Sequence, residues 1–218
     1  LIEDVRRFYA LRYNEPYAPI NKGDEDWRAR RITAYLDLLD RIVTRQFEDL
    51  KKTPFTPSSE ITKYFTILPD SSPLKGKYLK MLATSDASQK LALEEELRGS
   101  IATGRIDVNI MTKLDRINYG KTGEPLPDEY SDALAALRGF AKSTVRSGIV
   151  LSAGFNRKLY SYIEEFDAFF PDKNGIFQKE IILKVSDYRS AITQGKFLAM
   201  KGLWVSEYRV ESGLNCGG

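Results

Sequence analysis

The sequence contains no histidine and only one cysteine, Cys216, among its 218 residues. Without histidine, the chain cannot build a Ser-His-Asp triad, a Cys-His dyad or a His-based metal site from its own residues. A single cysteine cannot form an intrachain disulfide, which fits a cytoplasmic protein better than one from an oxidising compartment. Any general base in this chain would therefore be Asp, Glu, Lys, Tyr or Cys.

Long apolar runs and clusters of one charge sign are also missing. No apolar stretch approaches the roughly 18 residues that can span a bilayer, so we expect no membrane segment. The net charge is only +3, from 33 basic and 30 acidic residues that are interspersed. The densest basic cluster, residues 28–31, follows the acidic residues 24–26 in a helical pattern, which favours a solvated helix face. We therefore expect no nucleic-acid partner.

The first 104 residues show helical periodicity and no alternating strand pattern. The spacing of apolar residues predicts helices over residues 1–13, 24–50, 74–82 and 89–101, with a short helix after Ser58 or Ser59. The strongest pattern is the apolar stripe of residues 24–50, made by Ile32, Tyr35, Leu36, Leu39, Ile42, Val43, Phe47 and Leu50. We expect residues 1–104 to form a mainly helical region.

From residue 105 onward, short apolar segments alternate with helical ones. Strands are predicted at residues 106–111, 148–154, 180–185 and 204–210, with helices at 128–143, 156–166 and 187–201 between them, the last of which Ser186 or Asp187 can cap. Apolar strands joined by helical crossovers indicate parallel pairing with both faces of the sheet covered. We therefore expect residues 105–218 to form a parallel α/β region.

Two architectures fit this alternation, a partial (β/α)8 barrel and an open parallel sheet. Four predicted strands make half of such a barrel, and the last strand is not followed by the helix that a further βα unit requires. We expect a partial barrel whose chain continues beyond Gly218, with the open parallel sheet as the alternative.

Polar and cationic side chains follow the predicted strands, at the edge where ligands collect in both architectures. Lys113 follows the first strand, Lys184 interrupts the apolar third strand, and Arg189 begins the next helix. A lysine in an apolar strand must reach solvent, a carboxylate or an anionic ligand. Lys184 is therefore either a ligand-binding residue or the partner of Glu207 or Glu211 in a structural ion pair.

The last predicted strand carries a charged face and leads into a glycine-rich loop. Glu207, Arg209 and Glu211 alternate with less polar residues, so they share one face. We consider Lys184, Glu207 and Glu211 the catalytic candidates, with either acid as a general acid or base. A glycine-rich loop lets backbone amides approach a phosphate closely, although this one matches neither a P-loop nor GxGxxG. The predicted phosphate grip comprises Lys113, Arg189, Ser212, Gly213, Asn215, Gly217 and Gly218.

Two of these segments resemble parts of the FMN-binding (β/α)8-barrel oxidoreductases, such as the glutamate synthase and dihydroorotate dehydrogenase groups. IILKVSDYR, which contains Lys184, is similar to a strand end whose lysine contacts the flavin in that family. SGLNCGG is similar to the loop that holds the flavin phosphate, although here it follows the fourth strand rather than a late one. The resemblance covers residues 105–218 and implies FMN as cofactor and oxidoreductase activity.

The leading hypothesis is therefore an enzyme that binds a small phosphorylated ligand or flavin at the ends of parallel strands. The alternative is a non-catalytic interaction or assembly protein, in which the amphipathic helix 24–50 presents its apolar stripe to a partner. The sequence specifies neither the substrate nor the oligomeric state.

Overall fold

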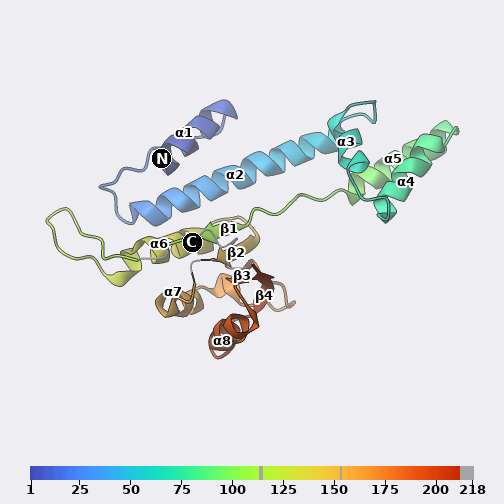
Figure 1. Cartoon of the computed structure of the whole chain (residues 1–218). Coiled ribbons are helices and arrows are strands. Elements are labelled where there is room, and N and C mark those ends of the chain that lie inside the picture. Colours follow the sequence, from blue (N-terminus) through green and yellow to red (C-terminus); the bar gives the residue numbers. More distant parts are fainter. Residues whose placement is uncertain (113–114, 153, 212–218) are drawn as a thin grey trace. The chain divides into compact units, whose positions relative to one another are not determined.

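A computed structural model describes residues 1–112, 115–152 and 154–211 (Figure 1). The chain divides into two compact units, one made of residues 1–40 and 105–218 and the other of residues 41–104. We call them the sheet unit and the helical unit. The boundary expected after residue 104 is one of the two places where the chain passes between units, and the other follows Asp40.

The helical unit folds around its own aromatic and aliphatic cluster. It contains the end of α2 (Trp27–Lys52), then α3 (Glu60–Thr66), α4 (Pro73–Ala83) and α5 (Ala87–Ser100). The Phe65 and Tyr78 rings stack with centroids 5.4 Å apart, and both side chains are buried. The Arg98 guanidinium donates to the carbonyls of Lys51 and Thr53, which satisfies groups that the end of α2 leaves without helical partners.

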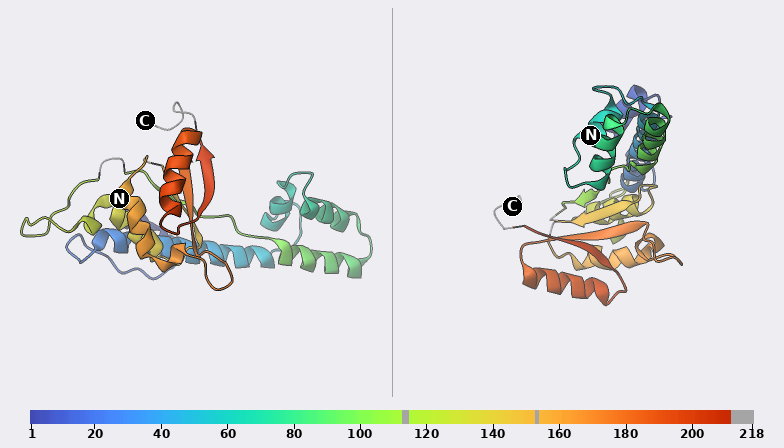
Figure 2. Two further views of the ribbon diagram at one scale, coloured as in Figure 1. Left: turned by 90° about the horizontal axis from the view of Figure 1, so that it is seen from below. Right: turned by 90° about the vertical axis from the view of Figure 1, so that its right-hand side faces the viewer.

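The sheet unit contains a parallel four-stranded sheet, so the predicted parallel α/β region is confirmed. The strand order is β1-β2-β3-β4, and every neighbouring pair is parallel. Over the described residues the sheet is open, with β1 and β4 at its edges (Figure 2). The elements are α1 (Ile2–Arg12), the start of α2, β1 (Val108–Ile110), α6 (Asp132–Ala141), β2 (Ser147–Leu151), α7 (Arg157–Tyr162), β3 (Lys179–Val185), α8 (Tyr188–Ala199) and β4 (Val205–Val210), with short 3-10 turns at Asp128–Tyr130, Ile163–Glu165 and Asp167–Phe169.

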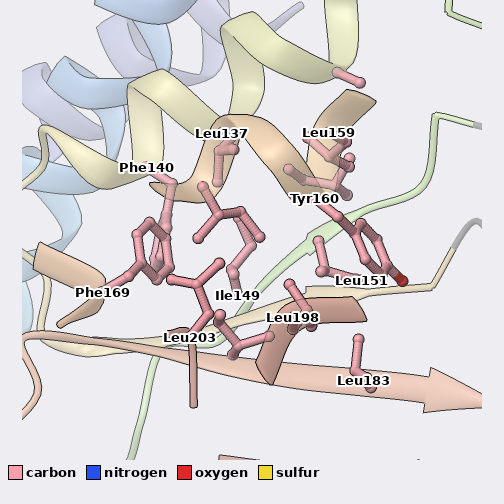
Figure 3. Packing of buried hydrophobic residues seen from close by; sticks show 14 of the residues in the cluster. Leu137, Phe140, Ile149, Leu151, Leu159, Tyr160, Phe169, Leu183, Leu198 and Leu203 are labelled. Carbon is pink, nitrogen blue, oxygen red and sulfur yellow. The ribbon is translucent and has the colours of Figure 1, made fainter. Parts of the chain in front are cut away.

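One face of the sheet forms the main hydrophobic core together with the crossover helices (Figure 3). The strands contribute alternate residues, as expected for side chains of period two. Burial of this apolar surface is the main favourable term in folding, at about 25 cal/mol per Å². The core residues include Leu137 and Phe140 of α6, Leu159 and Tyr160 of α7, Leu198 of α8, and Ile149, Leu151, Ile181, Leu183 and Val185 of β2 and β3.

Helix α2 buries Leu36 and Ile42 of the apolar stripe that the sequence showed, and the other six stripe residues are partly exposed. In the sheet unit, α2 lies directly against α6, because a Cβ at Gly139 would come within 2.8 Å of the Ala29 carbonyl oxygen. Part of the stripe therefore packs against other elements of this chain.

Helix α8 begins at the carboxyl end of β3 and is held there by an N-cap. The Asp187 carboxylate accepts a 2.8 Å hydrogen bond from the Ser190 amide, which confirms the predicted capping residue. The helix ends at Ala199, and Gly202, three residues later, has a φ of 74° that suits glycine. The cap places the first turn of α8 at the same edge of the sheet as the end of β3.

The amino end of β3 is anchored by a buried lysine. The Lys179 ammonium donates to the Ser143 carbonyl at 2.9 Å, to the Ser143 hydroxyl at 3.1 Å and to the Val145 carbonyl. Burial lowers the pKa of Lys179 to about 8, although the charges of Asp37 and Asp40 favour the ammonium form. Lys179 therefore joins β3 to the connection between α6 and β2 at the cost of burying a charge.

We expect Lys179 to make the free energy of unfolding change with pH in the alkaline range. Between pH 8 and the ordinary lysine value of 10.5, the unfolded chain binds a proton that the folded chain has lost, so stability rises with pH. Relative to Lys179→Met, the wild-type free energy of unfolding should rise by about 1–3 kcal/mol across this interval. Urea unfolding at several pH values measures it. The exposed Lys142→Met is the control, and a pH-independent difference between wild type and Lys179→Met would contradict the prediction.

Candidate functional site

The face of the sheet opposite the main core carries a row of charges. We call it the charged face. The pattern follows from the alternation of β-strands, which sends every second side chain to this side. Its charged residues are Arg105, Asp107, Glu180, Lys184, Glu207, Arg209 and Glu211.

Lys184 and Glu211, both predicted from the sequence, form an ion pair at the carboxyl end of this face. Lys184 Nζ lies 2.7 Å from Glu211 Oε2, and the two side chains are 20% and 36% exposed. The Glu211 amide donates to the Val185 carbonyl at 2.9 Å, which extends the β3–β4 pairing beyond β4 itself. Of the two acids that the sequence offered as partners of Lys184, the structure selects Glu211.

Arg209 joins the two edges of the sheet. Its guanidinium contacts Glu207 on its own strand and lies 3.1 Å from Asp107 Oδ2, beside the start of β1. Neighbouring strands are about 4.8 Å apart, so β1 and β4 of a flat sheet would be about 14 Å apart. A direct ion pair between their side chains therefore requires the sheet to curve toward the charged face.

This contact keeps both acids ionised. The hydrogen bond from Arg209 lowers the pKa of Glu207. Burial alone would raise the pKa of Asp107, but hydrogen bonds from the Gly148 amide and Arg209, with the charge of Arg105, lower it overall. A lowered pKa weakens a carboxylate as a base near neutral pH, so Glu207 is better suited to holding Arg209 than to proton transfer.

A second ion pair crosses the sheet above a glycine. Arg105 Nη1 lies 2.9 Å from Glu180 Oε2 of β3, although β2 runs between β3 and β1, the strand that Arg105 precedes. A Cβ at Gly148 would come within 2.8 Å of Arg105 Nη2 and would also collide with Ile182. Gly148 thus leaves the space through which this side chain crosses β2.

Two uncharged polar groups lie nearer the carboxyl ends of the strands. Ser152 follows β2, and its hydroxyl donates to Asn109 Oδ1 of β1 at 2.5 Å. Ser152 comes one residue after Leu151, and Lys184 one residue after its partner Leu183, so both occupy the next position of the register. Asn109, Ser152 and Lys184 therefore bring polar groups from three adjacent strands to one end of the charged face.

Among the described residues, no contact joins the predicted site residue Arg189 to Asn109, Ser152 and Lys184. Arg189 is exposed in the first turn of α8, and its carbonyl accepts from Thr193 within the helix. Four residues on this side of the sheet were not predicted from the sequence, although period-two alternation around the first and third strands could have revealed them: Arg105, Asp107, Asn109 and Glu180. The remaining predicted residues, Lys113, Ser212, Gly213, Asn215, Gly217 and Gly218, lie outside the described residues.

A hollow of about 330 Å³ lies elsewhere in the sheet unit, lined in part by Trp27, Tyr119 and Tyr130. Two of its charged residues are already paired with groups outside it. Arg138 binds Asp26 through two hydrogen bonds, and Arg28 Nε lies 2.9 Å from Asp132. The charged residues Asp26 and Arg28 that line the hollow are therefore explained by ion pairs within the fold.

Searches of family models, of curated proteins and of solved structures found no match for this chain. In the part that the structure describes, no cluster of three or more His, Cys, Asp or Glu residues could hold a metal ion. None of the helices in that same part has the length and apolarity needed to cross a bilayer. The functional inference therefore depends on the charged face.

We expect Gly148 to be required for the charged face to assemble. Gly148→Ala should lower the free energy of unfolding by about 1–3 kcal/mol, because the added methyl displaces Arg105 and Ile182. Gly104→Ala is the matched control, since a Cβ there would meet nothing within 4 Å. Urea unfolding followed by circular dichroism measures both variants, and equal stabilities would show that the crossing does not need the glycine.

Proposed function

We propose that this chain binds a phosphorylated ligand at the carboxyl end of the charged face, around Lys184. The observation that carries the proposal is the Lys184–Glu211 ion pair at the carboxyl end of a parallel sheet, where such folds bind ligands. Ser152 and Asn109 place hydroxyl and amide groups at the same end. The Ser152 hydroxyl donates to the Asn109 carbonyl oxygen, which orients the Asn109 amide nitrogen as a donor that can hold a phosphate beside Lys184.

Lys184 can bind a phosphate without losing its place in the fold. An ammonium has three donors, and Glu211 engages one side of it at 2.7 Å. A phosphate oxygen would take a second donor, while Glu211 keeps the lysine charged and oriented. Arg189 would act from the first turn of α8, and Lys113 with the 212–218 loop would complete the grip as the sequence predicts.

The finer form of the proposal is an FMN-dependent oxidoreductase built on a (β/α)8-type barrel. Supporting it are the sequential strand order and the curvature toward the charged face, both features of a barrel segment. In this form the flavin would supply the redox chemistry, and Lys184 would bind and orient it. The barrel form also needs another strand beside β4, whereas phosphate binding at Lys184 needs only the charged face.

The assembly alternative receives less support. It requires the apolar stripe of residues 24–50 to be available to a partner. Leu36 and Ile42 are each at most 5% exposed. Ile32, Phe47 and Leu50 pack against the hydrophobic cores of their own units, so this part of the stripe is not available to another protein.

We expect the Lys184→Met variant to lose at least about tenfold in FMN affinity, the equivalent of about 1.4 kcal/mol. Riboflavin, which lacks the phosphate, should bind equally to variant and wild type. Lys201→Met is a closely matched control, because Lys201 pairs with Glu164 at 2.8 Å with side-chain exposures of 21% and 38%. Flavin fluorescence titration measures all three proteins.

Two results would contradict the proposal. One is that the wild-type protein binds neither FMN nor inorganic phosphate. The other is that Lys201→Met weakens FMN binding as much as Lys184→Met, because the effect would then be one of general charge. Flavin absorbance in the purified protein, with FMN bound more tightly than riboflavin, would support the flavin form.

A further inference from the structure

The outer edge of β4 presents unpaired backbone groups. Among the described residues, β4 pairs only with β3. Because the Glu211 amide donates toward β3, the odd-numbered residues of β4 direct their backbone groups to β3 and the even-numbered ones direct theirs outward. From Glu207 onward, beyond the bulge at Ser206, the residues Tyr208 and Val210 therefore offer N–H and C=O groups to another strand, and such an edge is a template for pairing.

An apolar groove lies beside this edge. It has a volume of about 410 Å³ and is lined by Tyr188, Ala191 and Ile192 of α8 with Tyr208 and Val210 of β4. The side chains are strongly exposed, with Tyr188 at 79% and Val210 at 64%. An exposed apolar patch next to an open strand edge is typical of a protein–protein contact.

We propose that β4 pairs antiparallel with β4 of a second copy of this chain, about a two-fold axis that passes through Tyr208. A two-fold interface uses the same patch on both subunits, so the patch must complement itself. In this arrangement Tyr208 faces Tyr208 of the second copy in a hydrogen-bonded pair. The apolar grooves beside the two β4 strands then cover each other.

The charges of β4 select this register. With the axis at Tyr208, Glu207 lies opposite Arg209 of the second copy, and Arg209 lies opposite the second copy's Glu207. An axis at residue 207 would instead oppose two Glu207 side chains, and an axis at residue 209 would oppose two Arg209 side chains. Opposite charges across an antiparallel pair stabilise it and like charges destabilise it, so of the axes at residues 207, 208 and 209 only the one at Tyr208 is complementary.

The same pairing preserves the charged face. Residues directly opposite each other in a sheet share a face, so Glu207 and Arg209 of both copies lie on one continuous charged surface. The two Lys184 groups would lie toward opposite ends of that surface, because antiparallel strands point their carboxyl ends in opposite directions.

The first test is a charge exchange followed by mass measurement. Size-exclusion chromatography with light scattering should give the full chain a mass of twice 24.8 kDa at concentrations of about 100 µM. Arg209→Glu and Glu207→Arg should each weaken the dimer at least about tenfold, because each creates like-charge pairs across the axis. The double variant Glu207→Arg with Arg209→Glu should recover the dimer, since the exchanged charges are complementary again.

A second test avoids Arg209, whose contact with Asp107 supports the sheet itself. Val210→Pro removes an outward N–H and leaves the β3–β4 hydrogen bonds in place, so it should give a folded monomer. Val210→Thr keeps the N–H and should remain dimeric. Circular dichroism confirms that each variant is folded.

The proposal fails if the wild-type chain is monomeric at every concentration, or if a folded Val210→Pro variant has the same mass as wild type. A monomeric wild type would mean that the edge serves a different occupant, such as a strand that continues the sheet in parallel. A charge-exchanged double variant that is folded but monomeric would contradict the register. None of these results bears on phosphate binding at Lys184, which is measured separately, but a β4–β4 dimer would exclude the barrel form, which needs another strand beside β4.

Discussion

The contact between Arg209 and Asp107 is the constraint on which the charged face depends. It joins side chains from the two edges of the sheet at 3.1 Å, across the charged face. Without it, Asp107 would be left among Arg105 and the Gly148 amide, and Arg209 would keep only Glu207. Because these groups share partners, we expect substitutions among them to be non-additive.

The same network limits what the site can bind. Arg105, Lys184 and Arg209 supply three positive charges, whereas Asp107, Glu180, Glu207 and Glu211 supply four negative ones. The charged face therefore has no net positive field to attract an anion from a distance. A phosphate would be held by specific donors near Lys184, and repulsion from the neighbouring Glu211 carboxylate would lower its affinity.

Much of the fold could be predicted from the sequence, because it follows from local patterns. Apolar periodicity placed the strands and helices to within a few residues, and Asp187 was recognisable as a helix cap from its position before a periodic run. The sheet proved open across the described residues, while the barrel stays a prediction. The site was harder, because Arg105 and Asp107 acquire their partners only when distant strands come together. No local pattern indicates that Arg209 of the last strand reaches the start of the first.

The anchoring of Lys179 has a consequence for the order in which the sheet unit folds. Its ammonium is buried among the Ser143 hydroxyl, the Ser143 carbonyl and the Val145 carbonyl, more than thirty residues earlier in the chain. Until those oxygens are in place, burying β3 would desolvate a charge without compensation. β3 would therefore join the sheet late in folding, after α6 and β2 have formed. The amides of β3 should then exchange with solvent whenever the α6–β2 segment opens.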